Sequence, residues 1–164
     1  MPYEGSYNWR MRQQIGSDLL LVPGAIVLLI REDGAILFTR RTYNGVWCLP
    51  GGGAEEGSSF ARTAVTELRE ETGVVVDPAD LVPFACLSEA ELHSVTYPGG
   101  DVNHWFAMLF FARRWEGEPE PDGDETSEML WADPASLPSP LEPPHSLAIK
   151  FLRAYLRDGE FQVS

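Results

Sequence analysis

The chain has few of the features that mark secreted or membrane proteins. Its two cysteines, Cys48 and Cys86, each lie in an apolar stretch, so we expect reduced core residues rather than a disulfide or a metal pair. The longest apolar stretch is interrupted by Pro23 and Gly24 and is too short to cross a bilayer. The polar N-terminal segment shows no signal-peptide pattern. We therefore expect a soluble, cytoplasmic protein without a membrane partner.

Basic residues are also scarce. The sequence has 12 Lys and Arg against 25 Asp and Glu, which gives a formal net charge of −13. Because binding to a nucleic-acid backbone relies on Lys and Arg, we do not expect a nucleic-acid polymer as partner. A small phosphorylated ligand is compatible with this charge when metal ions lie between protein carboxylates and ligand phosphates.

The length and composition predict one folded domain. A chain of 164 residues fits a single domain, 1–164, and 44% hydrophobic residues are enough to bury a core. We find no internal repeat and no sign of a second domain. A homodimer is compatible with these features.

Strand patterns dominate, with two main helices between them. We expect strands at 24–31 and 35–40, joined as a hairpin by the Asp33-Gly34 turn. Segment 59–72 lacks Gly and Pro and is predicted to be a helix. Further strands are expected at 47–49, 74–76, 81–87, 105–111 and 130–131, an acidic loop at 116–128 and an amphipathic helix at 146–156. This order predicts an α/β sandwich with a mixed sheet between helices.

The predicted helix carries three carboxylates on one face. Glu67, Glu70 and Glu71 stand at i, i+3 and i+4, within an arc of roughly 100° and about 6 Å of axial rise. The other side shows the apolar stripe Phe60, Ala61, Ala64, Val65 and Leu68, which should face a core. The three charges repel one another and oppose the helix dipole, and a hard divalent cation would compensate them. The alternative is a solvated acidic face with Arg62 or Arg69 nearby.

A glycine run precedes this helix. Gly51, Gly52 and Gly53 follow a predicted strand, and their backbone can approach a ligand or metal closely. The whole segment 50–74, PGGGAEEGSSFARTAVTELREETGV, resembles the Nudix box, whose pattern is G-x(5)-E-x(7)-R-E-U-x-E-E-x-G-U with U aliphatic. The box extends over 52–74. The hairpin before it and the later predicted strand at 130–131 also fit the layout of the Nudix family.

Two positions depart from the box pattern. Ser58 stands where the family has a glutamate, and Thr66 where it has an arginine. These two side chains commonly pair in the family, so their joint absence leaves no unpartnered charge. Glu55 or Glu56 is a candidate replacement for the carboxylate, and Arg62 or Arg69 for the base. Ser58 and Ser59 are also candidates for capping the helix.

The resemblance implies a Nudix-type α/β/α sandwich and a Mg²⁺-dependent hydrolase, with Mn²⁺ as an alternative ion. Glu67, Glu70 and Glu71, with the carbonyl of Gly52 or Gly51, would hold the metal, which offsets phosphate charge and activates a water. A glutamate would take the proton. Glu67 is one candidate. Glu125 of the acidic loop is the other, with a solvated loop acid as its alternative interpretation.

Substrate contacts are predicted less specifically. Arg40 and Arg41 end a strand beside the expected cleft and are candidates for gripping a phosphate, although strand alternation directs one of them elsewhere. The glycine backbone at Gly51 is a further candidate contact. Four aromatic residues are candidates for stacking on a base, each with a core role as the alternative: Tyr43, Trp47, Trp105 and Trp131.

We therefore expect a hydrolase that cleaves a phosphoanhydride bond in a nucleoside diphosphate derivative: a nucleotide sugar, a dinucleoside polyphosphate or a nucleoside triphosphate. The alternative is a Nudix-fold protein that senses a nucleotide without cleaving it, which only the changes at Ser58 and Thr66 favour. Within the family, a proline or a tyrosine about fifteen residues beyond the box marks particular substrates. Pro83 comes too early and Tyr97 too late for these motifs.

Overall fold

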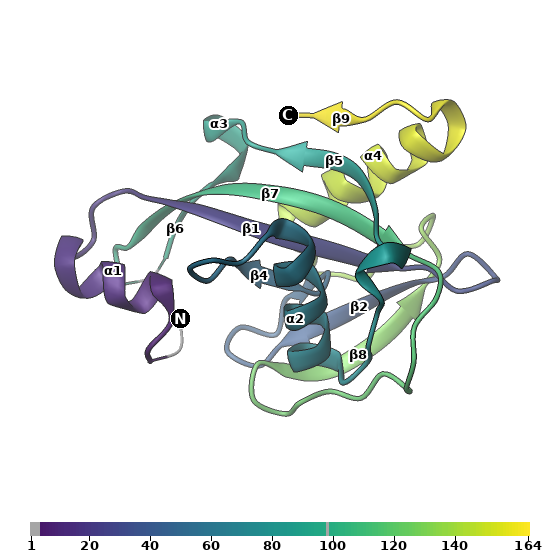
Figure 1. Ribbon diagram of the computed structural model, residues 1–164, viewed down its shortest axis with the longest axis horizontal. Coiled ribbons are helices and arrows are strands. Elements are labelled where there is room, and N and C mark those ends of the chain that lie inside the picture. Colours follow the sequence, from purple (N-terminus) through teal and green to yellow (C-terminus); the bar gives the residue numbers. More distant parts are fainter. Residues whose placement is uncertain (1–3, 98) are drawn as a thin grey trace.

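Two β-sheets and the helices around them form the structure (Figure 1), a computed structural model that describes residues 4–97 and 99–164. The larger, mixed sheet has the order β4 (Gly51–Gly53), β1 (Leu20–Leu29), β7 (Val102–Ala112), β5 (Val82–Leu87) and β9 (Gln162–Val163), and β6 (Ser94–Thr96) also pairs with β7. The smaller, antiparallel sheet has the order β3 (Trp47–Cys48), β2 (Ile36–Arg41) and β8 (Thr126–Ala132). The helices are α1 (Tyr7–Ile15), α2 (Phe60–Thr72), α3 (Ala90–His93) and α4 (Pro143–Asp158), with a 3₁₀ turn at Pro78–Asp80.

Strand β1 is the centre of the larger sheet. It runs parallel to β7 from Leu20 opposite Asn103 to Leu29 opposite Ala112, and antiparallel to the glycine strand β4 on its other edge. Most β1 side chains after Pro23 are buried on both faces, which explains the near-continuous apolar run in the sequence.

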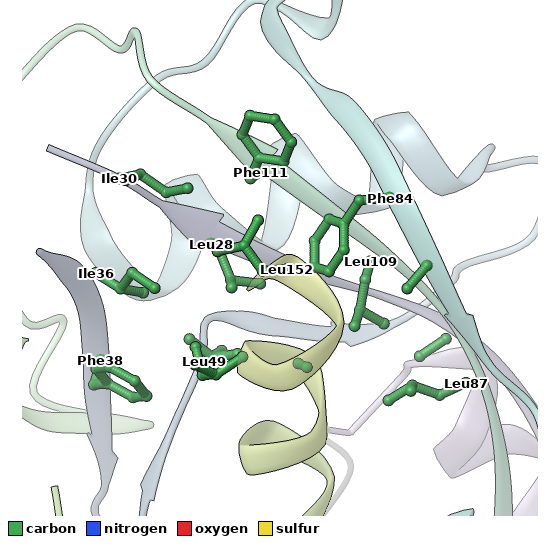
Figure 2. Close-up of a cluster of buried hydrophobic side chains, with 14 of the residues drawn as sticks. Leu28, Ile30, Ile36, Phe38, Leu49, Phe84, Leu87, Leu109, Phe111 and Leu152 are labelled. Carbon is green, nitrogen blue, oxygen red and sulfur yellow. The ribbon is translucent and has the colours of Figure 1, made fainter. Parts of the chain in front are cut away.

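Helices α2 and α4 cover opposite faces of this sheet (Figure 1). Successive β1 side chains, such as Val27 and Leu28, point to opposite faces of the sheet, so each face has its own apolar cluster. The cluster under α2 contains Ala25, Val27, Leu29, Ala64, Leu68 and Phe110. Figure 2 shows the cluster under α4, which includes Leu28, Phe38, Leu49, Phe84, Leu109, Phe111 and Leu152. The predicted α/β sandwich is therefore confirmed.

Two predicted features are wrong in detail. Residues 24–31 and 35–40 do form strands around the Asp33 turn, but they meet only at the Ile30–Ile36 bridge and then enter different sheets. Residues 74–76 form no strand, because only Val75 pairs, with Glu116. The glycine run, which was predicted only to lie between a strand and the helix, is itself an edge strand, since each of its residues faces one of β1.

Other segments extend or add to the prediction. The acidic segment is a loop only as far as Glu125, and β8 then begins at Thr126. Helix α1 in the polar N-terminal segment was not expected, and neither were α3, β6 and β9. Cys48 is buried and Cys86 partly buried, both with free thiols. No helix in the described part of the chain is long and apolar enough to cross a membrane.

Candidate active site

Helix α2 begins and ends as the sequence predicts. The Ser59 hydroxyl accepts a hydrogen bond from the Arg62 N–H at 3.2 Å, so it caps the N-terminus, and Gly73 ends the helix. Ala64 and Leu68 are buried beneath the helix, as expected of the apolar stripe. Phe60 is an exception: it is 38% exposed and lines a surface hollow together with Tyr7 of α1 and Pro23 of β1.

The glycine strand β4 lies directly against the acidic face of α2. A methyl group at Gly52 would collide with the Glu67 carboxylate, and one at Gly51 with the backbone of Ala25. The Gly51 N–H donates to the Glu71 carboxylate at 3.1 Å. In an extended strand the N–H and C=O of one residue point to the same side, so the Gly51 carbonyl also faces the outer edge. Gly51 lies opposite Ile26 and Gly52 opposite Ala25 in the register with β1. Because the Pro50 carbonyl accepts from the Val27 N–H, alternation along the strand also turns the Gly52 carbonyl toward β1, which favours Gly51 as the carbonyl available to a metal.

Two of the three carboxylates are sheltered from water. Glu71 is only 4% exposed, and burial raises its pKa to about 8 although Arg41 and the Gly51 N–H oppose the rise. Burial also raises the pKa of Glu67 to about 7, with the charges of Glu70 and Glu125 adding to the effect. Neighbouring acids that resist ionisation together form a place where positive charge is strongly favoured.

The third carboxylate, Glu70, is exposed. It lines a surface cavity of about 540 Å³ together with Thr66 and Arg69. Within residues 4–97 and 99–164, no three His, Cys, Asp or Glu side chains lie close enough together to form a metal site. The structure therefore brings Glu67 and Glu71 to the glycine strand and leaves Glu70 beside them on the solvent side.

Arg41 is the cation that faces this carboxylate pair. Its charge lowers the pKa of both Glu67 and Glu71. Its guanidinium donates to Glu142 at 3.1 Å and 3.5 Å, and both side chains are about one quarter exposed, at 25% and 26%. Burial opposes ionisation of Glu142, but the hydrogen bond from His145 and the charge of Arg41 outweigh it and lower the pKa of Glu142 to about 2.

Arg40 has different partners from Arg41, as strand alternation predicts. Its guanidinium donates to the Gly45 carbonyl at 2.9 Å and to Glu128 at 3.1 Å, and it lies over the Trp47 ring at 5.8 Å. Trp47 also packs against the core cluster under α4. Of the other aromatic candidates, Tyr43 is exposed, Trp131 stacks on Trp115, and Trp105 lies against Gly24.

The acidic loop brings Glu125 toward the site. Its carbonyl accepts from the Thr42 N–H at 2.9 Å, next to Arg41, and the Asp122 carboxylate holds the turn by accepting three backbone N–H groups. The Glu125 side chain is exposed, yet its charge raises the pKa of both Glu67 and Glu71. Its role as a general base stays a prediction.

The two positions that depart from the box pattern are Ser58 and Thr66. The Ser58 hydroxyl accepts from the Thr63 hydroxyl at 3.1 Å, and Thr66 is exposed. The proposed replacement acids are engaged elsewhere: Glu55 accepts the Tyr7 N–H of α1 at 2.8 Å, and Glu56 accepts from Arg10 at 2.9 Å. The replacement bases Arg62 and Arg69 are exposed as well.

Sequence reasoning missed Glu142 and His145. Both lie at the N-terminus of α4, which begins three residues before the predicted 146–156 helix. The one available signal was a histidine next to an amphipathic helix, with an acid three residues before it. That pattern is too common to indicate an active site by itself.

Comparison with known proteins identifies the family of this chain. Residues 20–154 match the NUDIX domain family. A Bacillus subtilis protein named putative 8-oxo-dGTP diphosphatase is 31% identical over 120 residues, covering 73% of this chain and 71% of that protein. An RNA pyrophosphohydrolase of Erythrobacter litoralis is 30% identical over 138 residues, covering 77% and 84%.

A solved structure shares the fold. The MutT NUDIX hydrolase from Burkholderia pseudomallei has a TM-score of 0.64 at 24% identity, covering 81% of this chain and 98% of its own. Since the family match spans most of the chain, and relatives that align along most of their length are named diphosphatases and pyrophosphohydrolases, this protein is a member of the Nudix hydrolase family.

Proposed function

We propose that this protein is a Mg²⁺-dependent pyrophosphohydrolase that cleaves a phosphoanhydride bond of a nucleotide derivative. The observation that carries the proposal is the pair of sheltered carboxylates, Glu67 and Glu71, against the glycine strand. Two acids whose pKa values are both raised in this way gain most from a bound cation, which favours their charged forms.

The donor set suits a hard metal ion. Carboxylate and carbonyl oxygens are the ligands that Mg²⁺ and Mn²⁺ prefer. Glu67 and Glu71 would hold the ion with the Gly51 carbonyl on the outer edge of β4, and Glu70 would join from the exposed side of the same helix turn. A bound ion of this kind offsets phosphate charge and lowers the pKa of a coordinated water.

The protein's own groups then have separate tasks. Glu67 or Glu125 accepts the proton of the attacking water. The charge of Arg41 is close enough to Glu67 and Glu71 to lower the pKa of both. A phosphate bound beside these carboxylates would therefore also be within reach of the Arg41 guanidinium, which would neutralise part of its charge. Arg40 and Trp47 are placed together at the end of β2 and β3, where they would contact the remainder of the substrate.

The relatives' names support a substrate that is derived from a nucleotide. One is named for 8-oxo-dGTP and another for RNA. The net charge of −13 disfavours extensive contact with an RNA backbone but does not prevent recognition of its terminal phosphates. We therefore include RNA ends among the candidate substrates. This set of substrates is wider than the one expected from the charge of the sequence, which disfavoured any nucleic-acid polymer.

The test is a substrate panel with a matched variant. Purified protein is incubated with nucleoside triphosphates, ADP-ribose, a dinucleoside polyphosphate and a 5′-triphosphorylated RNA, with Mg²⁺, with Mn²⁺ or with excess chelator. We expect release of a nucleoside monophosphate, a shortened nucleotide or pyrophosphate that the chelator abolishes. Full activity in excess chelator would refute the metal mechanism.

The variant Glu71→Gln sharpens this test. It keeps an acceptor for the Gly51 N–H but removes the charge, so we expect at least a ~100-fold loss of turnover with the fold retained. Glu56→Gln is the control, because Glu56 is exposed and contacts Arg10 outside the carboxylate pair. Near wild-type turnover in Glu71→Gln would contradict the assignment of this face.

A nucleotide sensor is the second candidate. The absence of a three-carboxylate cluster among the described residues and the changes at Ser58 and Thr66 favour it. Nucleotide binding without turnover on the whole panel would support a sensor and exclude the hydrolase.

A further inference from the structure

His145 connects two parts of the active site that lie far apart in the sequence. The side chain is 7% exposed, and both ring nitrogens have partners. Nδ1 accepts the Leu49 N–H at 2.8 Å, and Nε2 lies 3.1 Å from the Glu142 carboxylate. Because Nδ1 accepts a hydrogen bond, the proton of the neutral ring is on Nε2, which donates to Glu142.

The first partner belongs to the segment that leads into the glycine strand. The residues just before α4 also hold this segment through backbone hydrogen bonds. The Trp47 N–H donates to the Pro140 carbonyl at 2.8 Å, and the Glu142 N–H donates to the Trp47 carbonyl at 3.0 Å. Leu49 is followed by Pro50 and then by Gly51, whose N–H reaches Glu71. The position of the Gly51 backbone thus depends on contacts at both ends of a short segment.

The second partner holds the arginine. Glu142 accepts from His145 on Oε2, and from Arg41 on Oε1 at 3.1 Å and on Oε2 at 3.5 Å. This arrangement fixes the direction of the long Arg41 side chain, which otherwise has many rotamers. Thr66 stands at the position of the box arginine and is exposed, so Arg41 supplies from β2 the countercharge that the box lacks.

We propose that His145 is a positioning residue with two separable tasks. Its Nδ1 fixes the segment that carries Gly51 and so tunes metal binding, whereas its Nε2–H fixes Glu142 and, through it, the Arg41 that meets substrate phosphate. The proposal rests on the proposed function and deepens it, because it assigns the metal side and the phosphate side to opposite nitrogens of one ring.

Two substitutions separate the tasks. In His145→Asn, the amide oxygen takes the place of Nδ1 and accepts the Leu49 N–H, but no donor reaches Glu142. In His145→Gln, the longer side chain places its NH₂ near the former Nε2, so the donor to Glu142 is kept and the acceptor for Leu49 is lost.

Each variant is measured for Mn²⁺ affinity by calorimetric titration without substrate, and for KM and kcat with the nucleotide that the panel identifies. Loss of a residue that orients a ligand typically costs about 10- to 100-fold in metal affinity. We expect His145→Gln to weaken Mn²⁺ affinity by about tenfold or more with KM little changed. His145→Asn should raise KM about tenfold and leave Mn²⁺ affinity within about twofold.

Glu142→Gln and His104→Asn complete the design. Glu142→Gln keeps an acceptor for His145 and removes the charge that orients Arg41, so it should raise KM as His145→Asn does. It also tests the phosphate side of the proposal if a histidine variant does not fold. His104→Asn is the control, because His104 contacts the Ser88 carbonyl at 2.8 Å outside this network, and it should change neither quantity.

Equal changes in metal affinity and KM in both His145 variants would overturn the proposal, as would wild-type values of both. An unchanged KM in Glu142→Gln would overturn its phosphate side. If the wild type hydrolyses nothing on the panel, only the proposed function fails. The same variants then decide the inference through Mn²⁺ affinity and the affinity for a methylene analogue of ATP.

Discussion

Replacing Glu142 by Gln should destabilise the fold in a pH-dependent way. Glu142 accepts hydrogen bonds from Arg41 and His145, and their combined effect lowers its pKa to about 2 from an ordinary value of 4.5. A tenfold change in an ionisation constant corresponds to ~1.4 kcal/mol. At neutral pH the ionised carboxylate therefore stabilises the native state by about 3 kcal/mol relative to its protonated form.

The sign of the pH dependence follows from the direction of the shift. Because the folded-state pKa is the lower one, the stabilisation is fully present above pH 4.5 and is lost as pH falls toward 2. We expect the difference in unfolding free energy between wild type and Glu142→Gln to be about 3 kcal/mol at pH 7, to stay constant to about pH 5, and to shrink below that.

The assay is urea unfolding followed by tryptophan fluorescence at several pH values between 7 and 3. Glu128→Gln is the control, since the Arg40–Glu128 pair at 3.1 Å has side chains that are 37% and 57% exposed. An exposed pair contributes about 0–1 kcal/mol, so this variant should change little. A loss in Glu142→Gln that equals the control, or that stays constant down to pH 3, would refute the reasoning.

Three other experiments test the carboxylate face. Gly52→Ala should lower stability by about 1–3 kcal/mol, measured by thermal unfolding, and reduce turnover, because its methyl group meets the Glu67 carboxylate; unchanged turnover would contradict the close contact. Glu70→Gln should lower turnover at least ~100-fold with an unchanged circular dichroism spectrum, and a near wild-type rate would remove Glu70 from the metal site. Ser58→Glu with Thr66→Arg should raise metal affinity or turnover more than Thr66→Arg alone. Strictly additive effects in a double-mutant cycle would show that the two positions do not interact.

Local patterns were sufficient to predict the parts of the site that are close in sequence. The helix bounds followed from Ser59 and Gly73, and the buried stripe from Ala64 and Leu68. These features depend on propensity, capping and periodicity, which act within a few residues. The prediction that Phe60 is buried was wrong, because periodicity indicates which face of a helix is apolar and not how much of that face is covered.

Contacts between distant segments were not predictable in this way. Val75 has strand-like neighbours but found only one partner, and the glycine run paired with β1 although glycine is disfavoured in strands. The Arg41–Glu142 contact joins residues 101 positions apart. No periodicity relates such positions, so the countercharge was sought nearby, at Arg62 and Arg69, rather than in β2.

The parallel pairing of β1 with β7 also has a consequence for folding. Residues 20–29 must wait for residues 102–112 before the central sheet closes, and pairings of this sequence separation form slowly. Helix α2 lies between the two strands in sequence, and its hydrogen bonds are local, so its first turns can form without residues 102–112. On a ribosome its acidic face would therefore emerge long before Glu142 does, so the Arg41–Glu142 contact beside that face can form only after residue 142 has been made.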